Sequence, residues 1–266
     1  MLQEIRSKDN AYLKQVRLLQ QKKHRQEQGL FLVEGLRLAE EAVASGFAIA
    51  YGLVGPRLLE LDRGRQLVQA LRARNVPLFL VAEERLLAGA LATEHPQGIA
   101  LVLAMPPAGL EALDAAKDWV LVADRISDPG NLGGLFRSAY AAGAQALLAT
   151  PGCCDCYNPK VLRAAMGAIF RLPFYEATSD EELSTFLHKK GLHIYIAAAE
   201  GSMVYTQADL RRPLALVMGA EADGVQPFWR QAADGALRLP MTPGAESLNV
   251  GAAAAVLLYE IRRQRT

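Results

Sequence analysis

The stretch "DWVLVADRISDPGNLGGLFRSAYAAG", residues 118–143, decides the fold. A continuous apolar run is followed by a turn rich in glycine and proline, and then by a helical pattern that Gly143 ends. A strand that is apolar at nearly every position is typical of a parallel sheet covered on both faces. The spacing of Gly130, Gly133 and Gly134 in the turn does not match the dinucleotide-binding pattern. The stretch therefore predicts an α/β layer, but the turn alone does not indicate what it binds.

The same alternation continues to the end of the chain. The expected strands are apolar runs at residues 119–126, 144–150, 193–199, 214–219 and 236–241. The expected helices lie at residues 131–143, 159–170, 180–191, 227–232 and 247–264. Strands that alternate with helices in this way predict a parallel sheet with helices on its faces.

The first half of the chain predicts a smaller α/β domain. A basic amphipathic helix is expected over residues 1–25 and a second helix over residues 31–46. The other expected elements are strands at residues 48–55, 76–81 and 98–106 and a helix at residues 63–75. Paired prolines and few large apolar residues then indicate a linker. We therefore divide the chain into an N-terminal domain (1–105), a linker (106–116) and a C-terminal domain (117–266).

The bulk composition is that of an ordinary globular protein. Hydrophobic residues make up 51% of the chain and the formal net charge is +1, so total charge does not indicate a nucleic-acid binder. The local charge differs, because residues 1–30 carry seven Lys or Arg against three acidic residues. Such a cluster either binds phosphate or forms a solvated helix face.

The sequence also bears on compartment and metal content. It does not start with a signal-peptide pattern, and no apolar stretch reaches the roughly 18 residues that span a membrane. Cys153, Cys154 and Cys156 crowd into "PGCCDCYNP" without a matching His or Cys cluster elsewhere. Neither a disulfide framework nor a zinc site is expected from that pattern. We expect free thiols in a reducing cytoplasm, no membrane association and no bound metal.

Three turns that follow expected strands carry unusual residues, at the edge where parallel sheets bind ligands. In the first turn, a helix that begins near Asn131 places Arg137 above Gly133 and Gly134, because helical side chains lean toward the N-terminus. The guanidinium would then lie beside Asn131 and the free amides of the helix start, a combination that attracts phosphate. A capped helix with a surface arginine explains the same spacing.

The other two turns are weaker signals when taken singly. In "LVMGAEADGV" the carboxylate of Glu221 stands between Gly219 and Gly224, and glycine permits close approach of the backbone to a ligand. In "SLNVGAAAA" the hydroxyl of Ser247 and the amide of Asn249 stand together at a helix start. An ordinary turn and an ordinary helix cap account for these two patterns equally well.

Together, the three turns resemble the three motifs of the SpoU (TrmH-like) family of RNA ribose 2′-O-methyltransferases, within the SPOUT superfamily. They follow the family's order, with N-x-G-x-x-x-R from Asn131 to Arg137, G-x-E-x-x-G from Gly219 to Gly224, and S-L-N at residues 247–249. The segment "NPKVLRAAMGAIFRLP" is also similar to the family. In the first half, "GLFLVEGLRLAEEAV" and "HPQGIALVL" resemble its RNA substrate-binding domain.

The resemblance implies a fold and a cofactor. The fold is a C-terminal parallel-sheet SPOUT domain with a deep trefoil knot, an arrangement otherwise nearly absent from proteins, plus a smaller N-terminal α/β RNA-binding domain. The cofactor is S-adenosylmethionine, and the assembly is a homodimer. The implied cofactor-binding residues are Leu216, Val217, Met218, Gly219, Leu239, Pro240, Met241, Leu248 and Asn249. Ala165 and Gly251 depart from the family, because many members carry serine there.

The resemblance further implies methyl transfer to a ribose 2′-hydroxyl. The implied catalytic residues are Asn131, Arg137, Glu221, Ser247 and Asn249. Arg137 would activate the hydroxyl, or would hold the 3′-phosphate and stabilise the developing alkoxide. Candidate phosphate contacts in the N-terminal domain are Lys22, Lys23, Arg25, Arg37, Arg63, Arg65, Arg72 and Arg74. Such contacts position an RNA without reading its sequence.

Alternative functions remain open at this stage. Ribosomal RNA is the favoured substrate, because the separate N-terminal domain resembles that of the rRNA-acting members. Transfer RNA is the alternative substrate, and an inactive RNA-binding or ribosome-assembly protein of the same fold is the alternative class. A dehydrogenase of the Rossmann type is disfavoured, because G-x-G-x-x-G is missing after the first strand of the second half.

Overall fold

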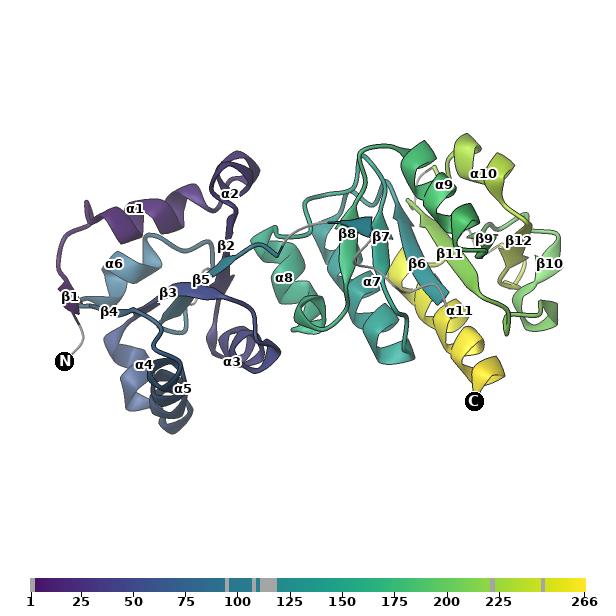
Figure 1. Ribbon diagram of the computed structural model, residues 1–266. Coiled ribbons are helices and arrows are strands. Elements are labelled where there is room, and N and C mark those ends of the chain that lie inside the picture. The colour runs from purple at the N-terminus through teal and green to yellow at the C-terminus, as the bar shows by residue number, and fades with distance from the viewer. Residues whose placement is uncertain (1–2, 94–95, 107–108, 111–118, 221–222, 245–246) are drawn as a thin grey trace. The chain divides into compact units, whose positions relative to one another are not determined.

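The computed structural model describes residues 3–93, 96–106, 109–110, 119–220, 223–244 and 247–266 (Figure 1). The chain forms two compact units. The first unit combines Met1–Pro107 with Tyr157–Phe170, and the second combines Ala108–Cys156 with Arg171–Thr266. Most of the expected linker, residues 106–116, lies outside the described residues, so the predicted domain limits stay a prediction.

A mixed five-stranded sheet forms the centre of the first unit. Its strands, in spatial order, are β1 (Gln3–Ile5), β4 (Leu78–Val81), β3 (Ile49–Val54), β5 (Ile99–Ala104) and β2 (Leu30–Glu34). The pairs β1–β4 and β4–β3 are parallel, whereas β5 runs antiparallel to both of its neighbours. The predicted α/β class of this unit therefore holds, with a mixed sheet.

Helices cover both faces of this sheet (Figure 1). They are α1 (Ala11–Leu18), α2 (Lys22–Gln28), α3 (Leu36–Ser45), α4 (Pro56–Glu60), α5 (Asp62–Ala73) and α6 (Glu84–Ala88). Leu13, Val16 and Leu19 from the α1 segment and Leu87 from α6 share one buried cluster with the sheet. The helices α3, α4 and α5 pack together on the opposite face. The helix α8 (Pro159–Ala165) and the short 3₁₀ turn Ala168–Phe170 also belong to this unit.

Two expectations for the first unit were wrong. The single helix expected over residues 1–25 is the strand β1 followed by the two helices α1 and α2. The helix expected over residues 31–46 begins only at Leu36, because residues Leu30–Glu34 form β2. Gly35 separates the two elements with a φ of 93°, in the left-handed region that glycine tolerates best.

The second unit contains a seven-stranded sheet in which every pairing is parallel. Its spatial order is β10 (Met203–Val204), β12 (Gly235–Arg238), β9 (His193–Ala197), β11 (Leu214–Gly219), β6 (Trp119–Asp124), β7 (Leu147–Ala149) and β8 (Phe174–Glu176). The predicted parallel sheet is confirmed. The short strands β8 and β10 were not predicted, and the knot stays a prediction.

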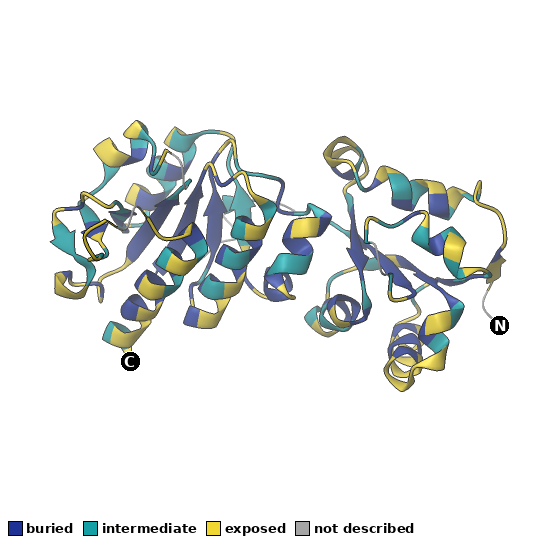
Figure 2. Cartoon of the chain, turned by 180° about the vertical axis from the view of Figure 1, so that it is seen from behind, coloured by how far each residue is buried: buried dark blue, intermediate teal, exposed yellow. Residues whose placement is uncertain are grey.

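Four helices sandwich this sheet: α7 (Pro129–Ala142), α9 (Asp180–Lys189), α10 (Pro227–Ala232) and α11 (Val250–Arg265). Leu183, Leu187 and Trp229 from α9 and α10 pack into a buried cluster with one face of the sheet. On the other face α7 and α11 lie side by side, each with a buried stripe toward the sheet and an exposed stripe toward solvent (Figure 2). Burial on both faces explains why β6 is apolar at every residue before Asp124, with which it ends.

Because the strands are parallel, their carboxyl ends share one edge of the sheet. The central pair is β11 and β6, and the chain continues from them toward opposite sides of the sheet. Such a switch point in strand order is where open α/β sheets bind ligands. The three turns singled out in the sequence all lie in this unit.

Candidate functional site

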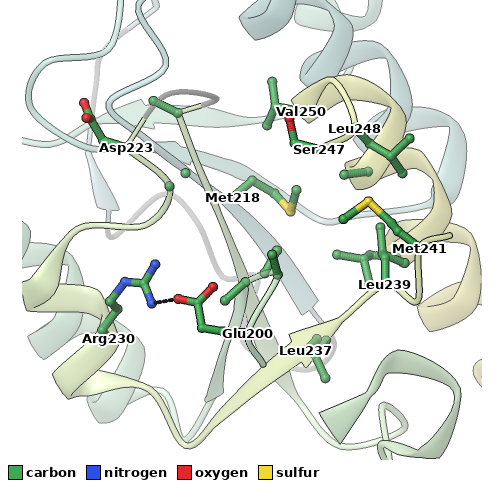
Figure 3. Close-up of a pocket in the computed structure, with 18 residues that line it drawn as sticks. Glu200, Met218, Asp223, Arg230, Leu237, Leu239, Met241, Ser247, Leu248 and Val250 are labelled. Carbon is green, nitrogen blue, oxygen red and sulfur yellow. Dashed lines mark hydrogen bonds and ion pairs between the residues drawn. The ribbon is translucent and has the colours of Figure 1, made fainter. Parts of the chain in front are cut away.

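A cavity of about 300 Å³ opens at this edge of the sheet (Figure 3). Its wall is largely apolar and comes from the turns after β9, β11 and β12 and from the start of α11. The side chains of Met218, Leu239, Met241 and Leu248 converge on it (Figure 3). We call it the first cavity. Its apolar lining suits a flat aromatic ring.

Gly219 shapes this cavity by letting two backbone segments touch. A Cβ at position 219 would lie 2.2 Å from the carbonyl carbon of Gly224. Gly224 has a φ of 65°, and its N–H donates to the carbonyl of Ala220 at 2.8 Å. Both glycines of the G-x-E-x-x-G pattern are therefore required by geometry. Glu221, which stands between them, lies outside the described residues.

One ion pair stands in the first cavity. The guanidinium of Arg230 donates to the Glu200 carboxylate, and this hydrogen bond lowers the pKa of Glu200 (Figure 3). The Nε of Arg230 also donates to the carbonyl of Val225 at 2.9 Å. These contacts hold charged groups beside an otherwise apolar space.

A second cavity of about 420 Å³ adjoins the first. The two share four lining residues, Ala220, Asp223, Gly224 and Val250. The lining that only the second cavity has is mostly polar: Arg125, Ile126, Ser127, Asp128, Asn131, Gly152 and Gln226. An apolar site and a polar site thus lie next to each other at the same sheet edge, as a transfer between two bound molecules requires.

One hydrogen bond joins the first and third sequence motifs. The Nδ2 of Asn249 donates to the Oδ1 of Asn131 at 3.0 Å. The Oδ1 of Asn249 accepts from the N–H of Gly251 at 2.9 Å, so Asn249 is also the N-cap of α11. Asp128 plays the same part for α7, because its Oδ1 accepts from the N–H of Asn131 at 2.8 Å. The cap of α11 is therefore bonded to Asn131 in the first turn of α7, which fixes the starts of the two helices against each other.

A buried carboxylate that binds Gln226, a lining residue of the second cavity, was not predicted from the sequence. Asp124 is fully buried at the end of β6. It accepts hydrogen bonds from the N and Nε2 of Gln226, at 2.8 and 2.5 Å, and from the Oγ1 of Thr150 at 3.2 Å. An acidic residue that ends an otherwise apolar strand is the sequence signal that points to it. It holds the loop before α10 against the end of β6.

The predicted site residues divide into three groups. Met218, Gly219, Leu239, Met241, Ser247 and Leu248 line the first cavity, and Asn131 lines the second. Leu216 and Val217 line neither cavity, because their side chains are buried within β11. Pro240 is exposed and lines neither.

Arg137 does not line the cavity that Asn131 lines, contrary to the position predicted from the sequence. It is exposed on α7, lines neither cavity, and has no hydrogen-bond or ion-pair partner among the described residues. The expected position of its guanidinium beside Asn131 is therefore not found within one chain. Gly134, one turn earlier in α7, has open space where a side chain would lie.

The predicted phosphate contacts of the first unit are not one patch. Arg25 was wrongly chosen, because it is only 2% exposed and its Nη1 donates to the carbonyl of Leu19 at 2.7 Å. The exposed candidates are Lys22, Lys23, Arg37, Arg63, Arg65, Arg72 and Arg74. Arg63 pairs with Glu40, and Arg65 pairs with Asp62. The lysines lie on α2, whereas the arginines lie on α3 and along α5 and its C-cap.

The cysteines are free thiols with raised pKa values. Burial raises the pKa of Cys153 to about 11 and that of Cys154 to about 12. Cys153 accepts from the N–H of Ile126 at 3.3 Å and donates to the carbonyl of Ala123 at 3.2 Å. Such thiols stay protonated at neutral pH, which makes them poor nucleophiles. Within the described part of the chain, no group of three His, Cys, Asp or Glu could hold a metal ion, and no helix could cross a membrane.

Comparisons with known proteins cover nearly the whole chain. The model of the "SpoU rRNA Methylase family" matches residues 118–259, and the model of the "MRM3-like substrate binding domain" matches residues 10–101. A relative from Bacillus subtilis, the 23S rRNA (guanosine(2553)-2′-O)-methyltransferase RlmP, is 33% identical over 98% of this chain and 100% of its own. The 23S rRNA (uridine(2479)-2′-O)-methyltransferase of Streptomyces viridochromogenes is 30% identical over 98% of this chain and 92% of its own.

Solved structures agree with these relatives. The SpoU methyltransferase AviRb from Streptomyces viridochromogenes, in complex with the cofactor AdoMet, superimposes with a TM-score of 0.88 at 29% identity. The alignment covers 96% of this chain and 98% of that one. An AdoMet-bound rRNA methyltransferase from Sinorhizobium meliloti gives a TM-score of 0.87 at 28% identity, over 98% of each chain.

Proposed function

The chain belongs to the SpoU rRNA methylase family, and from this membership we propose that it transfers a methyl group to a ribose 2′-hydroxyl of ribosomal RNA. The cofactor is S-adenosylmethionine. The observation that carries the proposal is the pair of adjoining cavities, together with the hydrogen bond that fixes Asn131 in the wall of the second cavity to Asn249 at the start of α11. One cavity suits the cofactor, and the other suits the nucleotide that receives the methyl group.

The first cavity fits S-adenosylmethionine in shape and chemistry. Met218, Leu239, Met241 and Leu248 offer apolar contacts for the adenine, and the backbone at Gly219 is open to close approach because no Cβ stands there. The carboxylates of Glu200 and Asp223 lie in the same lining, and carboxylates accept hydrogen bonds from hydroxyl and ammonium groups. When bound, the cofactor supplies an electrophilic methyl group on a sulfonium.

The second cavity would hold the target nucleotide. Asn131 lies in its wall and is fixed by Asn249, so its amide can orient the ribose without first being ordered. Asp223 and Val250 line both cavities, so the acceptor oxygen would meet the methyl group near them. Excluding water from such a polar space strengthens every charge interaction inside it.

The chain would act as a homodimer that completes the site with Arg137. Tyr140 on α7 is 44% exposed, and on α11 Val256 is 40% and Tyr259 is 52% exposed. Exposed apolar side chains gathered on two packed helices mark a surface for association. Arg137 lies one turn from Tyr140 on α7, so pairing through this surface would bring it to the second cavity of the partner.

Arg137 would then stabilise charge rather than accept a proton. The pKa of an arginine is above about 12, so its guanidinium stays charged at neutral pH. A fixed positive charge lowers the free energy of the developing alkoxide on the 2′-oxygen. The same group can also donate to the 3′-phosphate of the nucleotide.

The first unit would supply RNA affinity, in the cytoplasm where ribosomal RNA is processed. Its exposed Lys and Arg side chains on α2, α3 and α5 can contact phosphates. Ribosomal RNA is favoured over transfer RNA, because the relatives from Bacillus subtilis and Streptomyces viridochromogenes carry 23S rRNA in their names and align over nearly the whole chain. An inactive RNA-binding protein would have no use for the cofactor cavity.

The central test replaces Arg137 with alanine. We expect Arg137→Ala to lower the rate of methyl transfer from labelled S-adenosylmethionine to 23S rRNA by at least about a hundredfold. The calorimetric Kd for the cofactor should stay at the wild-type value, because Arg137 lines no part of the first cavity. Arg211→Ala, at another exposed arginine of the same unit, should keep full activity. Near-normal turnover in Arg137→Ala would contradict the assignment.

The RNA itself can be identified in the cell. Mapping 2′-O-methylation across total RNA, with and without this gene, should show one ribosomal nucleotide that loses its methyl group. A loss confined to transfer RNA would leave the chemistry in place and overturn the choice of substrate.

A further inference from the structure

Arg125 has an unusual backbone conformation at the end of β6. It has a φ of 55°, in the left-handed region where a bulky side chain is disfavoured. The other two non-glycine residues with positive φ in the described chain, Asn75 and Met166, lie within two residues of the C-terminal end of a helix, where such a conformation is common. Arg125 instead follows a strand, and its N–H donates to the Oγ1 of Thr150 at 3.0 Å. Strain of this kind is found where function requires it.

The strained backbone directs the side chain into the second cavity, where it is held on two sides. The Nη1 of Arg125 donates to the Oε1 of Gln226 at 3.2 Å, and Gln226 is itself fixed by the buried Asp124. On the other side the Arg125 side chain lies against Gly152. A Cβ at position 152 would lie 3.4 Å from the Cγ and 3.5 Å from the Nε of Arg125. An exposed arginine is thus ordered before any ligand arrives.

The guanidinium is ordered, and carboxylates of the described residues lie near it without a direct ion pair; one of them, Asp180, acts on it electrostatically. Among the described residues, none forms an ion pair with Arg125, although the carboxylates of Asp128 and Asp223 line the same cavity. The Oδ1 of Asp128 is already used as the cap of α7. A guanidinium has five N–H donors in a planar fork, and the bond to Gln226 uses only one of them. Arg125 itself lines the polar second cavity.

We propose that Arg125 binds a backbone phosphate of the substrate RNA and so positions the target nucleotide in the second cavity. This inference rests on the proposed function. A guanidinium fork matches the oxygens of a phosphate, and a side chain that is already ordered loses little entropy on binding. Gln226 and Gly152 are then the residues that position Arg125, and Asp124 acts through Gln226.

Arg125→Gly separates this role from a structural one, because glycine relieves the strained φ while it removes the guanidinium. We expect an unchanged or higher Tm, an increase of about tenfold in KM for in vitro transcribed 23S rRNA, and little change in kcat. The slope of log affinity against log salt for that RNA should fall by about one. Arg125→Lys keeps the positive charge but lacks the planar guanidinium. Its KM and salt slope should therefore lie between those of the wild type and those of Arg125→Gly.

A control variant and two further measurements distinguish phosphate binding by Arg125 from a structural role and from cofactor binding. Arg211→Gly, the same replacement at an exposed arginine outside both cavities, should leave the KM and the salt slope unchanged. A lower Tm with unchanged KM and slope in Arg125→Gly would show a structural role and overturn the inference. A weaker calorimetric Kd for S-adenosylmethionine would overturn it as well, because Arg125 would then bind the cofactor. The salt slope needs no methylation, so an inactive wild type would contradict only the proposed function.

Discussion

At the scale of single residues, Gly219 is a position in the candidate site where a side chain cannot be added without moving the backbone. The ideal Cβ of any other residue would overlap the backbone of Gly224 at 2.2 Å, and backbone cannot rotate away as a side chain can. We expect Gly219→Ala to lower the free energy of unfolding by about 3 kcal/mol. The shared wall of both cavities should shift with it, so cofactor affinity measured by calorimetry should fall more than tenfold, a factor that corresponds to about 1.4 kcal/mol.

Gly134 provides the matched control for that variant. It lies inside α7 with no atom within 4 Å of where a Cβ would lie. Gly134→Ala should therefore raise the free energy of unfolding by about 0.5–1 kcal/mol, because alanine loses less entropy than glycine in a helix. Thermal unfolding of the two variants checks the predicted loss of stability in Gly219→Ala and the predicted gain in Gly134→Ala. Equal changes in the free energy of unfolding for Gly219→Ala and Gly134→Ala would mean that the close contact between Gly219 and Gly224 does not affect stability.

Single residues also show what sequence alone can reveal about a site. Asn131, Gly219 and Asn249 were found because they stand in short motifs at the ends of predicted strands. Arg125 was not found, because its importance lies in its φ and in a contact with Gln226, 101 positions away in the sequence. Arg25 was misjudged for the related reason that its burial depends on long-range packing.

At the scale of secondary-structure elements, the start of α11 combines two tasks in Asn249. Its Oδ1 caps the helix, while its Nδ2 holds Asn131. Asn249→Asp keeps the acceptor for the cap but loses the donor, so we expect a near-wild-type Tm together with a strongly reduced rate of methyl transfer. Asn249→Ala loses both tasks and should also cost about 1 kcal/mol of stability. Thermal unfolding and the methyl-transfer assay on the same samples separate the two effects.

The outcome of that comparison discriminates between a structural and a functional Asn249. If the aspartate variant keeps its activity, the bond to Asn131 does not matter for the reaction. If both variants unfold at the same lowered temperature, the cap in Asn249→Asp has failed and its activity says nothing about Asn131. Asn158, which caps α8 with its own side chain, serves as a cap control outside the second unit.

Elements with one clear periodicity were predicted correctly, and those with mixed signals were not. The strands β6 and β11 are apolar at almost every position because helices cover both faces of the sheet. The strand β2 was taken for a helix because its sequence runs directly into the pattern of α3, and only the positive φ of Gly35 separates them. The strands β8 and β10 have two or three half-buried residues, too few to show a period.

At the scale of the whole molecule, the apolar surface of α7 and α11 predicts the assembly. A charge at Tyr259, which is 52% exposed on α11, should block association of this surface. We expect Tyr259→Glu to sediment as a monomer and to lose methyl transfer, because Arg137 would no longer reach a partner. Its calorimetric affinity for S-adenosylmethionine should persist, since Tyr259 lines neither cavity.

The control places the same charge elsewhere in the unit. Thr185 is exposed on α9, on the face of the sheet opposite α11, and Thr185→Glu should sediment and react like the wild type. A Tyr259→Glu protein that is monomeric yet fully active would show that each chain has a complete site. That result would also remove the reason for placing Arg137 beside a partner's cavity.

The first unit is built from two separate segments of the chain, and this limits where the chain can be divided. Residues Tyr157–Phe170 are encoded inside the catalytic half, yet they pack with the N-terminal unit, where Tyr157 and Phe170 lie against Phe31. A single proteolytic cut at Gly109 would therefore give two bands on a denaturing gel but one species on a native gel. The two parts of the sequence are thus held together by packing as well as by the covalent chain. A gene truncated near residue 109 would yield an N-terminal fragment in which Phe31 lacks its contacts with Tyr157 and Phe170.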